Sequence, residues 1–222
     1  MSWAPLALSL EVAALSTLVA LLFGTAIAVL LAWNKVPFRE LFYALVCAPL
    51  VLPPTVLGYY LLVALGTNSA LGRAWESLTG TTIVFSFTGA VIAAAVGSLP
   101  MVVRSARIGI EAVEPNLIAA ARTLGASPAR VLRTVVLPLA APAIVAGAML
   151  AFARALGDYG ITQMVAGQLI NGTETASIHV MNALYGGREE DARNMAIVTT
   201  IVGVGLLYLA NRVLKKLSGA HV

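Results

Sequence analysis

The sequence IAAARTLGASPARVLRTVVLPL, residues 118–139, is the one long, positively charged stretch with helical patterning in a chain that is otherwise mostly apolar. Leu117, Ala121 and Leu124 are spaced i, i+4 and i+7, which places them on one face of a short helix. Gly125 follows the last of these residues, at the position where a left-handed helix cap costs glycine little. The pattern therefore predicts a short helix that ends at Gly125.

Helix start signals flank this glycine on both sides. Pro115 suits the first turn of the first helix, because the amide proton that proline lacks would have no partner there. Ser127 followed by Pro128 is typical of a second start, with serine as the N-cap and proline in the first helical position. Two short helices should therefore meet at Gly125 and form a docking site between two membrane spans. The arginines spread over them are Arg122, Arg130 and Arg133.

The composition of the whole chain is that of a membrane protein. Charged residues make up 11% of the sequence and hydrophobic residues 59%, whereas soluble domains have about a quarter of their residues charged. The mean hydropathy is +0.91. No polar stretch is long enough to bury a core of its own, so residues 1–222 should form a single all-α integral membrane domain. Cys47 is the only cysteine, which excludes a disulfide within the chain and a cysteine-based metal site.

Five apolar segments approach or exceed the roughly 20 residues that a helix needs to cross the hydrocarbon core. The second should kink at its prolines and face protein or a water-filled path, because lipid cannot satisfy the carbonyls that proline leaves free. A loop of about residues 111–135 separates the third segment from the fourth. The five segments are residues 6–33, 41–65, 83–103, 136–156 and 195–214.

A sixth span would have to come from residues 157–185. That segment carries Asp158, Asn171, Glu174 and His179, and is too polar to cross lipid unprotected. We expect instead an outer loop with short helices that line the protein interior.

The distribution of basic residues orients the five spans, because cytoplasmic loops carry an excess of lysine and arginine. Arg73, Arg188 and Arg193 fall on the opposite side from most of the others. The N-terminus should therefore lie outside, and the 111–135 loop and the C-terminus in the cytoplasm. The residues on the cytoplasmic side are Lys35, Arg39, Arg104, Arg107, Arg122, Arg130, Arg133, Arg212, Lys215 and Lys216.

Catalytic and nucleotide-binding motifs are missing from the sequence. No Gly-x-x-x-x-Gly-Lys-Ser/Thr loop is present, so the chain is not expected to bind ATP in the P-loop manner. No His-Glu-x-x-His or Gly-x-Ser-x-Gly pattern occurs, and the acidic run of Glu189, Glu190 and Asp191 is expected to be solvated surface. The prediction is a non-enzymatic membrane subunit with no metal or cofactor of its own and no nucleic-acid partner. Its energy would come from an ATPase on another chain.

The 111–135 loop and the residues after it resemble the loop of importer-type ABC permeases. In that family Glu-Ala-Ala is followed by three residues, Gly, nine residues, Ile, one residue and Leu-Pro. The sequence departs from the family at Ala119, where glutamate is usual, and at Val135, where isoleucine is usual. The residues that match are Ala120, Ala121, Gly125, Leu137 and Pro138.

The resemblance implies a type I ABC importer permease with five transmembrane helices in a bacterial or archaeal inner membrane. It also implies a homodimer with the solute path at its two-fold axis, two copies of a cytoplasmic ABC ATPase that binds the ATP, and an extracytoplasmic oxyanion-binding protein. The loop residues implied to contact or move with the ATPase are Ala119, Ala120, Ala121, Arg122, Gly125, Leu137 and Pro138.

A resemblance that covers nearly the whole chain narrows the range of candidate solutes. Residues 48–66 (APLVLPPTVLGYYLLVALG) and 121–160 resemble the molybdate permease subunits, with sulfate/thiosulfate and tungstate permeases as near relatives. The pair Pro53-Pro54 followed by Gly58-Tyr59 favours molybdate. The implied function is molybdate import, with tungstate as a further candidate solute. A sulfate/thiosulfate or tungstate importer is the alternative, and a stand-alone channel or membrane scaffold is a distant one.

An oxyanion path should offer hydroxyl groups and a cation. Arg154 could attract an anion at the outer mouth, but Asp158 stands at i+4 and simple pairing of the two at a helix end is the favoured interpretation. The hydroxyl groups in the spans are also candidates, although such groups more often bond a backbone carbonyl or another helix. They belong to Thr55, Ser86, Thr88 and Ser98.

Overall fold

The computed structural model describes residues 3–32, 37–167 and 172–219, and over these residues the secondary structure is helical. Lys35 and Asn171, which the sequence argument used, lie outside the described residues. The helices are α1 (Ala4–Ala32), α2 (Arg39–Cys47), α3 (Pro54–Leu65), α4 (Ala70–Thr79), α5 (Phe87–Glu111), α6 (Pro115–Thr123), α7 (Pro128–Val131), α8 (Leu137–Leu156), α9 (Gly160–Ala166), α10 (Ala176–Tyr185) and α11 (Glu189–Gly219). A 3₁₀ turn at Ala48–Leu50 follows α2, and a π-helical segment at Leu132–Val136 joins α7 to α8.

Four helical segments within the described residues are long and apolar enough to cross a membrane. They are Ala4–Ala32, Phe87–Glu111, Pro128–Leu156 and Glu189–Arg212. A fifth crossing would be the broken pair Arg39–Leu50 and Pro54–Leu65, whose halves are bent by 110°.

The break in the second apolar segment confirms the expected kink. Pro53 has the extended backbone angles φ −54° and ψ 138°, and Pro54 then opens α3 at its first turn. Two adjacent prolines cannot donate the amide hydrogen bonds that would continue α2, and each disfavours helical geometry in the residue before it. The chain therefore turns a corner here and does not cross as one straight rod.

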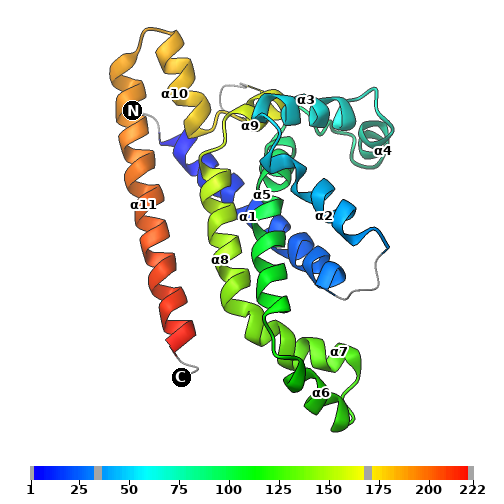
Figure 1. Ribbon diagram of the computed structural model, residues 1–222. Helices are drawn as coiled ribbons and strands as arrows, with labels where there is room; N and C mark the ends of the chain where they lie inside the picture. The colour runs from blue at the N-terminus through cyan, green and yellow to red at the C-terminus, as the bar shows by residue number, and fades with distance from the viewer. Residues whose placement is uncertain (1–2, 33–36, 168–171, 220–222) are drawn as a thin grey trace.

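Helices α1, α5 and α8 form the packed centre of the molecule (Figure 1). Small residues let α5 and α8 approach closely, as is usual between membrane helices. A Cβ atom at Gly109 would lie 2.6 Å from the Cβ of Ala143, and one at Gly147 would lie 2.8 Å from the Cβ of Ser105. Any side chain at either glycine would push the two helices apart.

Helix α11 stands at the edge of this bundle, beside α8 and α10 (Figure 1). The most apolar 18-residue part of α11 is 6% buried, whereas the corresponding part of α5 is 56% buried. Most of the apolar surface of α11 is therefore available to lipid or to another protein chain.

Both boundaries of α5 differ from those expected, and α11 extends beyond the predicted span of residues 195–214 at each end. α5 begins at Phe87 because Ser86 acts as its N-cap, accepting a 3.1 Å hydrogen bond from the amide of Gly89. It continues to Glu111, beyond the predicted end at residue 103, since Arg107 and Glu111 pair on its surface and Pro100 does not stop it.

The polar segment between α8 and α11 forms two short helices, as expected. α9 packs against α3 and α5, and α10 packs against α11 and α1. The Ser9 hydroxyl oxygen accepts a 2.7 Å hydrogen bond from the amide of Ala176, which ties the start of α10 to α1.

Candidate functional site

The 111–135 loop forms a helical hairpin, α6 and α7, at the end of the molecule opposite α3, α4 and α10 (Figure 1). Pro115 occupies the first turn of α6, and Gly125 has a φ of +81°, both as expected. The amide of Gly125 donates to Arg122 O at 2.9 Å and the amide of Ala126 donates to Ala121 O at 3.1 Å. These two bonds form a Schellman cap, which requires the left-handed backbone that Gly125 adopts.

The second helix of the hairpin also begins as predicted. Ser127 accepts a 3.4 Å hydrogen bond from the amide of Arg130, and Pro128 follows it in the first turn of α7. Both caps therefore form from residues within a few positions of each other.

The hairpin buries one side and exposes an apolar one. Ile118 and Ala121 pack against a buried cluster that includes Val131 and Val136. Leu117 is 45% exposed and Leu124 is 88% exposed, so the face on which they lie is not part of the core. Leu117 and Leu124 thus leave an apolar surface uncovered at the end of the hairpin.

The sequence-predicted loop residues are not all in one place. Ala119, Ala120, Arg122 and Gly125 are exposed on or just after α6, and Ala121 is half-buried. Leu137 and Pro138 lie further along, at the start of α8.

The hairpin is joined to α8 without a break. The helix runs continuously over Pro128–Leu156, and within it the amide of Leu137 bonds to Leu132 O, an i to i+5 bond. Pro138 has no amide proton for the regular bond, which accounts for a π-helical irregularity just before it. A displacement of α7 would therefore be carried directly into α8.

A charged cluster links α2 to the end of α5, next to the hairpin. The Arg107 guanidinium bonds to Glu40 Oε1 at 3.0 Å and to Glu111 Oε1 at 2.9 Å. The same group lies 4.5 Å from the ring centre of Tyr43, and Arg39 pairs with Glu40 at 3.1 Å. The sequence pattern does not predict this cluster as a whole. Only the i, i+4 spacing of Arg107 and Glu111 pointed to part of it.

The predicted pairing of Arg154 with Asp158 is confirmed. The Arg154 guanidinium donates to Asp158 Oδ1 at 2.8 Å, and the side chain of Asp158 is only 2% exposed. Asp158 Oδ2 also accepts from the amide and the hydroxyl of Thr162, at 2.9 and 2.8 Å. The carboxylate thus joins the end of α8 to the first turn of α9, a role that its spacing from Arg154 did not indicate.

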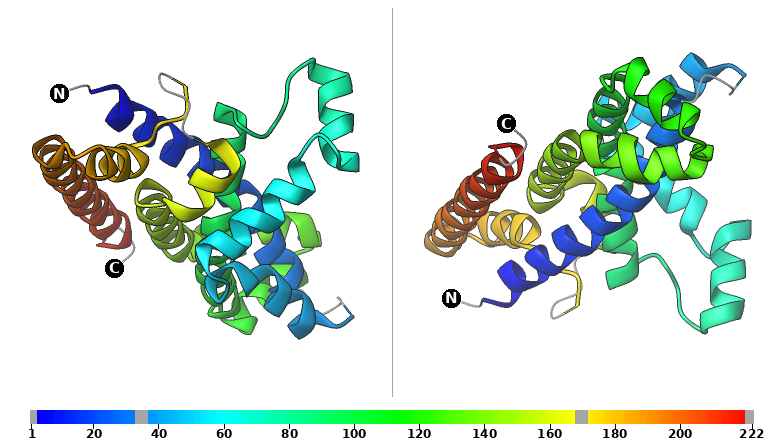
Figure 2. Two further views of the ribbon diagram at one scale, coloured as in Figure 1. Left: turned by 90° about the horizontal axis from the view of Figure 1, so that it is seen from above. Right: turned by 90° about the horizontal axis from the view of Figure 1, so that it is seen from below.

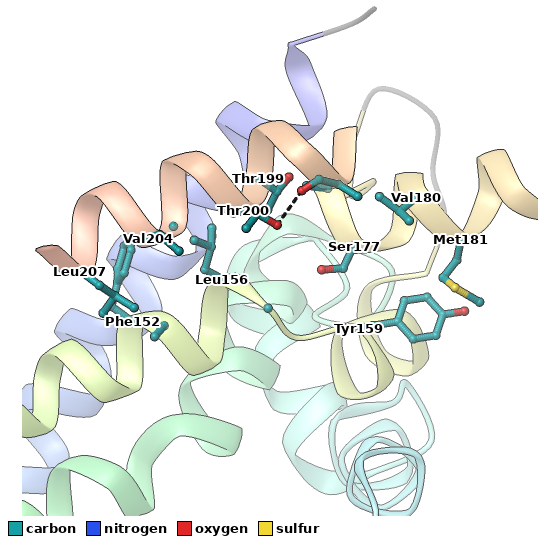
Figure 3. Close-up of a pocket in the computed structure, with 15 residues that line it drawn as sticks. Phe152, Leu156, Tyr159, Ser177, Val180, Met181, Thr199, Thr200, Val204 and Leu207 are labelled. Carbon is teal, nitrogen blue, oxygen red and sulfur yellow. Dashed lines mark hydrogen bonds between the residues drawn. The ribbon is translucent and has the colours of Figure 1, made fainter. Parts of the chain in front are cut away.

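A mostly apolar groove of about 540 Å³ lies between α8, α10 and α11 (Figure 3). Its walls include Phe152, Leu156, Val204 and Leu207, and Ser177 supplies one of its few hydroxyl groups. A second cavity, of about 390 Å³, lies between α1, α8 and α11 and shares Phe152 and Leu207 with the first. The two cavities follow from the loose packing of α11.

The family of binding-protein-dependent transport system inner membrane components matches residues 20–218 of this sequence. The chain belongs to this permease family. It is accordingly a multi-pass inner membrane protein, in agreement with its long apolar helices.

Several curated relatives in this permease family align over nearly the whole chain. The molybdenum transport system permease protein ModB of Escherichia coli strain K12 is 40% identical over 92% of this chain and 90% of its own length. The ModB protein of Haemophilus influenzae is 38% identical over 97% of this chain and 96% of its own length. A putative molybdenum transport system permease of Bacillus subtilis is 35% identical over 92% of this chain and 89% of its own length.

Solved structures show that the fold is that of type I ABC importer permeases. A chain of the MetNI methionine ABC transporter, in an inward-facing conformation, superimposes with a TM-score of 0.72 at 18% identity over 95% of this chain and 93% of that one. A chain of a bacterial alginate ABC transporter gives a TM-score of 0.72 at 14% identity, over 94% of this chain and 76% of that one.

In this permease the predicted path residues are scattered. Thr55 is exposed at the start of α3, Ser86 caps α5, and Thr88 is half-buried as the second residue of the same helix. Ser98 is fully buried and donates to Ala94 O at 2.7 Å, and Ser86 donates to Ile83 O at 2.6 Å. The expected bonding of intramembrane hydroxyl groups to backbone carbonyls is confirmed for these two serines.

The acidic run at the start of α11 is only partly solvated. Glu189 and Glu190 are exposed, but Asp191 is half-buried and lies 3.3 Å from His179 Nε2 and 3.0 Å from Arg188 Nη1. Glu174 lies 3.4 Å from the other ring nitrogen of His179. These contacts hold α10 against α11. No group of three or more His, Cys, Asp or Glu side chains among the described residues could hold a metal ion.

Proposed function

We propose that this permease is the membrane-spanning subunit of an ATP-driven importer that carries molybdate into the cytoplasm. In this proposal two copies of the chain form a homodimer with the solute path between them. Two copies of a cytoplasmic ABC ATPase bind the ATP, and an extracytoplasmic oxyanion-binding protein delivers the solute.

Similarity to known permeases supports molybdate as the solute. Curated permeases that align over most of this chain at 35–40% identity are named for molybdenum transport. A path for an oxyanion should also lack unpaired carboxylates, and Asp158 fits this condition because Arg154 neutralises it at 2.8 Å. This pairing makes Arg154 a weaker candidate for direct anion contact than a free guanidinium would be.

The charge distribution supports an orientation with the N-terminus outside. Arg122, Arg130 and Arg133 are exposed at the α6–α7 end of the molecule, whereas Arg73 and Arg188 are exposed at the other end. By the excess of basic residues in cytoplasmic loops, the α6–α7 hairpin faces the cytoplasm.

The exposed cap of α6 is the observation that best supports docking of an ATPase. Leu124, with 88% of its surface exposed, stands beside the rigid Schellman cap at Gly125. An ATPase that closes on ATP would pull α6, and the continuous helix over Pro128–Leu156 would carry the movement into the membrane. The cluster around Arg107 would carry it into α2.

Reconstitution tests the proposal. The chain is co-purified with a candidate ABC ATPase and a candidate binding protein, and ATP hydrolysis and solute uptake are measured in liposomes with molybdate, tungstate or sulfate. We expect stimulation by molybdate and tungstate but not by sulfate. Stimulation by sulfate alone would overturn the solute and keep the architecture. Failure of the chain to retain an ATPase subunit would overturn the importer assignment.

A further inference from the structure

Helix α4 is amphipathic, and both leucines of its apolar side are exposed, whereas Trp75 on the same side is half-buried. Leu71, Ala74, Trp75 and Leu78 fall at i, i+3, i+4 and i+7, which places them on one face. Leu71 is 62% exposed and Leu78 is 84% exposed. Charged and polar side chains occupy the opposite face, namely Arg73, Glu76 and Ser77.

Local contacts hold α4 in a fixed direction relative to α3. Ser69 caps the helix by accepting a 2.8 Å hydrogen bond from the amide of Gly72, and Arg73 donates to Asn68 O at 2.7 Å. A Cβ atom at Gly72 would overlap the carbonyl oxygen of Gly66, so only glycine permits this close turn. The exposure of the apolar face is therefore built into the turn between the two helices.

The direction of α4 is that of a helix lying on a membrane surface. Figure 1 shows α4 nearly end-on while α8 and α11 run along the page, and the left view of Figure 2 shows α4 lengthwise. α4 thus lies across the membrane-spanning helices, at the end of the molecule that carries α3, α9 and α10. It protrudes from the bundle and packs mainly on α3.

We propose that α4 lies in the lipid interface, with Leu71 and Leu78 among the acyl chains and Arg73 and Glu76 in the aqueous phase. The protein is embedded in a membrane, and the neighbouring helix α3 also exposes apolar side chains, among them Val63, which is 57% exposed. A short amphipathic helix with this division of side chains is a typical interfacial element. That the leaflet is the outer one rests on the proposed orientation; the lipid contact itself does not.

The exposed tryptophan before α1 fits a membrane interface. Trp3, which directly precedes α1, is 61% exposed. Tryptophan gathers at membrane–water interfaces, where its ring sits at the level of the headgroups. Trp75 on α4 is half-buried, and its indole Nε1 is buried within the protein.

The exposed face of α4 is too small to hold a protein partner by itself. A stable protein interface buries about 800 Å² on each partner. The exposed leucines of the 10-residue α4 offer far less than this. A lipid surface needs no such area, because α3 already anchors α4 to the membrane.

Site-directed spin labelling in the assembled transporter tests this inference. Single cysteines are placed at Leu78→Cys on the apolar face and at Glu76→Cys on the polar face, both in a Cys47→Ser background. The labelled complexes are reconstituted in liposomes, and collision with oxygen, which enters lipid, is compared with collision with a water-soluble nickel chelate. We expect oxygen to dominate several-fold at position 78 and the nickel chelate to dominate at position 76.

Each other outcome overturns the inference in a distinct way. Nickel accessibility at position 78 equal to that at position 76 would place the apolar face in water. Low accessibility to both reagents at position 78 would mean that protein covers the face, and spin–spin broadening would then identify a second copy of this chain. If Leu78→Cys does not yield folded complex, Leu71→Cys reports on the same face. None of these measurements depends on which oxyanion is transported.

Discussion

The guanidinium of Arg107 lies 3.0 Å from the carboxylate of Glu40, a residue 67 positions earlier in the chain. This contact joins the first half of the broken apolar segment to the end of α5, one turn before the α6–α7 hairpin begins. Glu40 is largely exposed, so solvent screens the pair and it adds little to folding stability. The contact is therefore better placed to transmit movement from the hairpin to α2 than to stabilise the fold.

Replacing Arg107 should therefore impair coupling more than folding. We expect Arg107→Ala to leave expression nearly unchanged, to lower the unfolding temperature modestly because its side chain is 12% exposed and packs on Tyr43, and to lower the number of solute ions imported per ATP hydrolysed. Arg104→Ala is the matched control. Arg104 is exposed one turn earlier on the same helix, and it forms no hydrogen bond or ion pair with the residues that the structure describes. Equal coupling ratios in the two variants would contradict the link.

The left-handed backbone at Gly125 should be needed for docking and not for membrane insertion. A Cβ atom at Gly125 would meet nothing within 4 Å, so the cost of a side chain there comes only from its φ of +81°. That cost is roughly 1–2 kcal/mol for most residues and is smaller for asparagine. Gly125→Val should insert normally and lose solute uptake, while Gly125→Asn should retain most of it. Normal uptake by Gly125→Val in the reconstituted transporter would show that the Schellman cap is dispensable.

The exposed Leu124 should contribute to ATPase binding. We expect Leu124→Asp to reduce the amount of ATPase that co-purifies with the permease at least several-fold. The fold should be unaffected, because 88% of this residue is already in contact with solvent. Asn116→Asp introduces the same charge at an exposed position on the same helix and serves as the control. If both variants retain the ATPase, its binding surface lies elsewhere on the hairpin.

The carboxylate of Asp158 should stabilise the junction of α8 and α9. It accepts three hydrogen bonds, from Arg154 and from the amide and hydroxyl of Thr162. Asp158→Ala leaves the buried groups of Thr162 unsatisfied, which costs about 1–3 kcal/mol. For a chain of this size each kcal/mol corresponds to a fall of about 2–4 °C in the unfolding temperature.

Asp158→Glu keeps the carboxylate and should lose less stability than Asp158→Ala in a thermal melt of the detergent-solubilised protein. An unchanged melting temperature for Asp158→Ala would show that water replaces these bonds at no cost.

The parts of the structure that the sequence predicted well are governed by residues close together in the chain. The Schellman cap at Gly125, the serine cap at Ser127 and the break at Pro53-Pro54 all depend on contacts within about five positions. Each follows from backbone sterics that proline and glycine change in a known direction. The apolar segments are equally predictable, because a helix must reach a minimum length to cross the hydrocarbon core.

Prediction was less complete where the outcome depends on which side of a helix meets another helix. The spacing of Leu117 and Leu124 places them on one face, but it does not indicate that α6 packs Ile118 against the core and exposes both leucines. Asp191 looked like solvated surface until α10 placed His179 against it.

The sequence by itself thus determined the membrane class, the break in the second apolar segment and the capped hairpin, because short-range sterics and the length requirement of the bilayer decide them. Only the tertiary structure decided that Glu40 meets Arg107, that Asp158 is buried against Thr162 and that α4 exposes its leucines. The meeting of Glu40 with Arg107 depends on how α2 packs against α5, and small residues such as Gly109 and Gly147 set how closely α5 packs against α8. In a membrane helix nearly every face is apolar, so hydrophobicity alone does not select the face that packs.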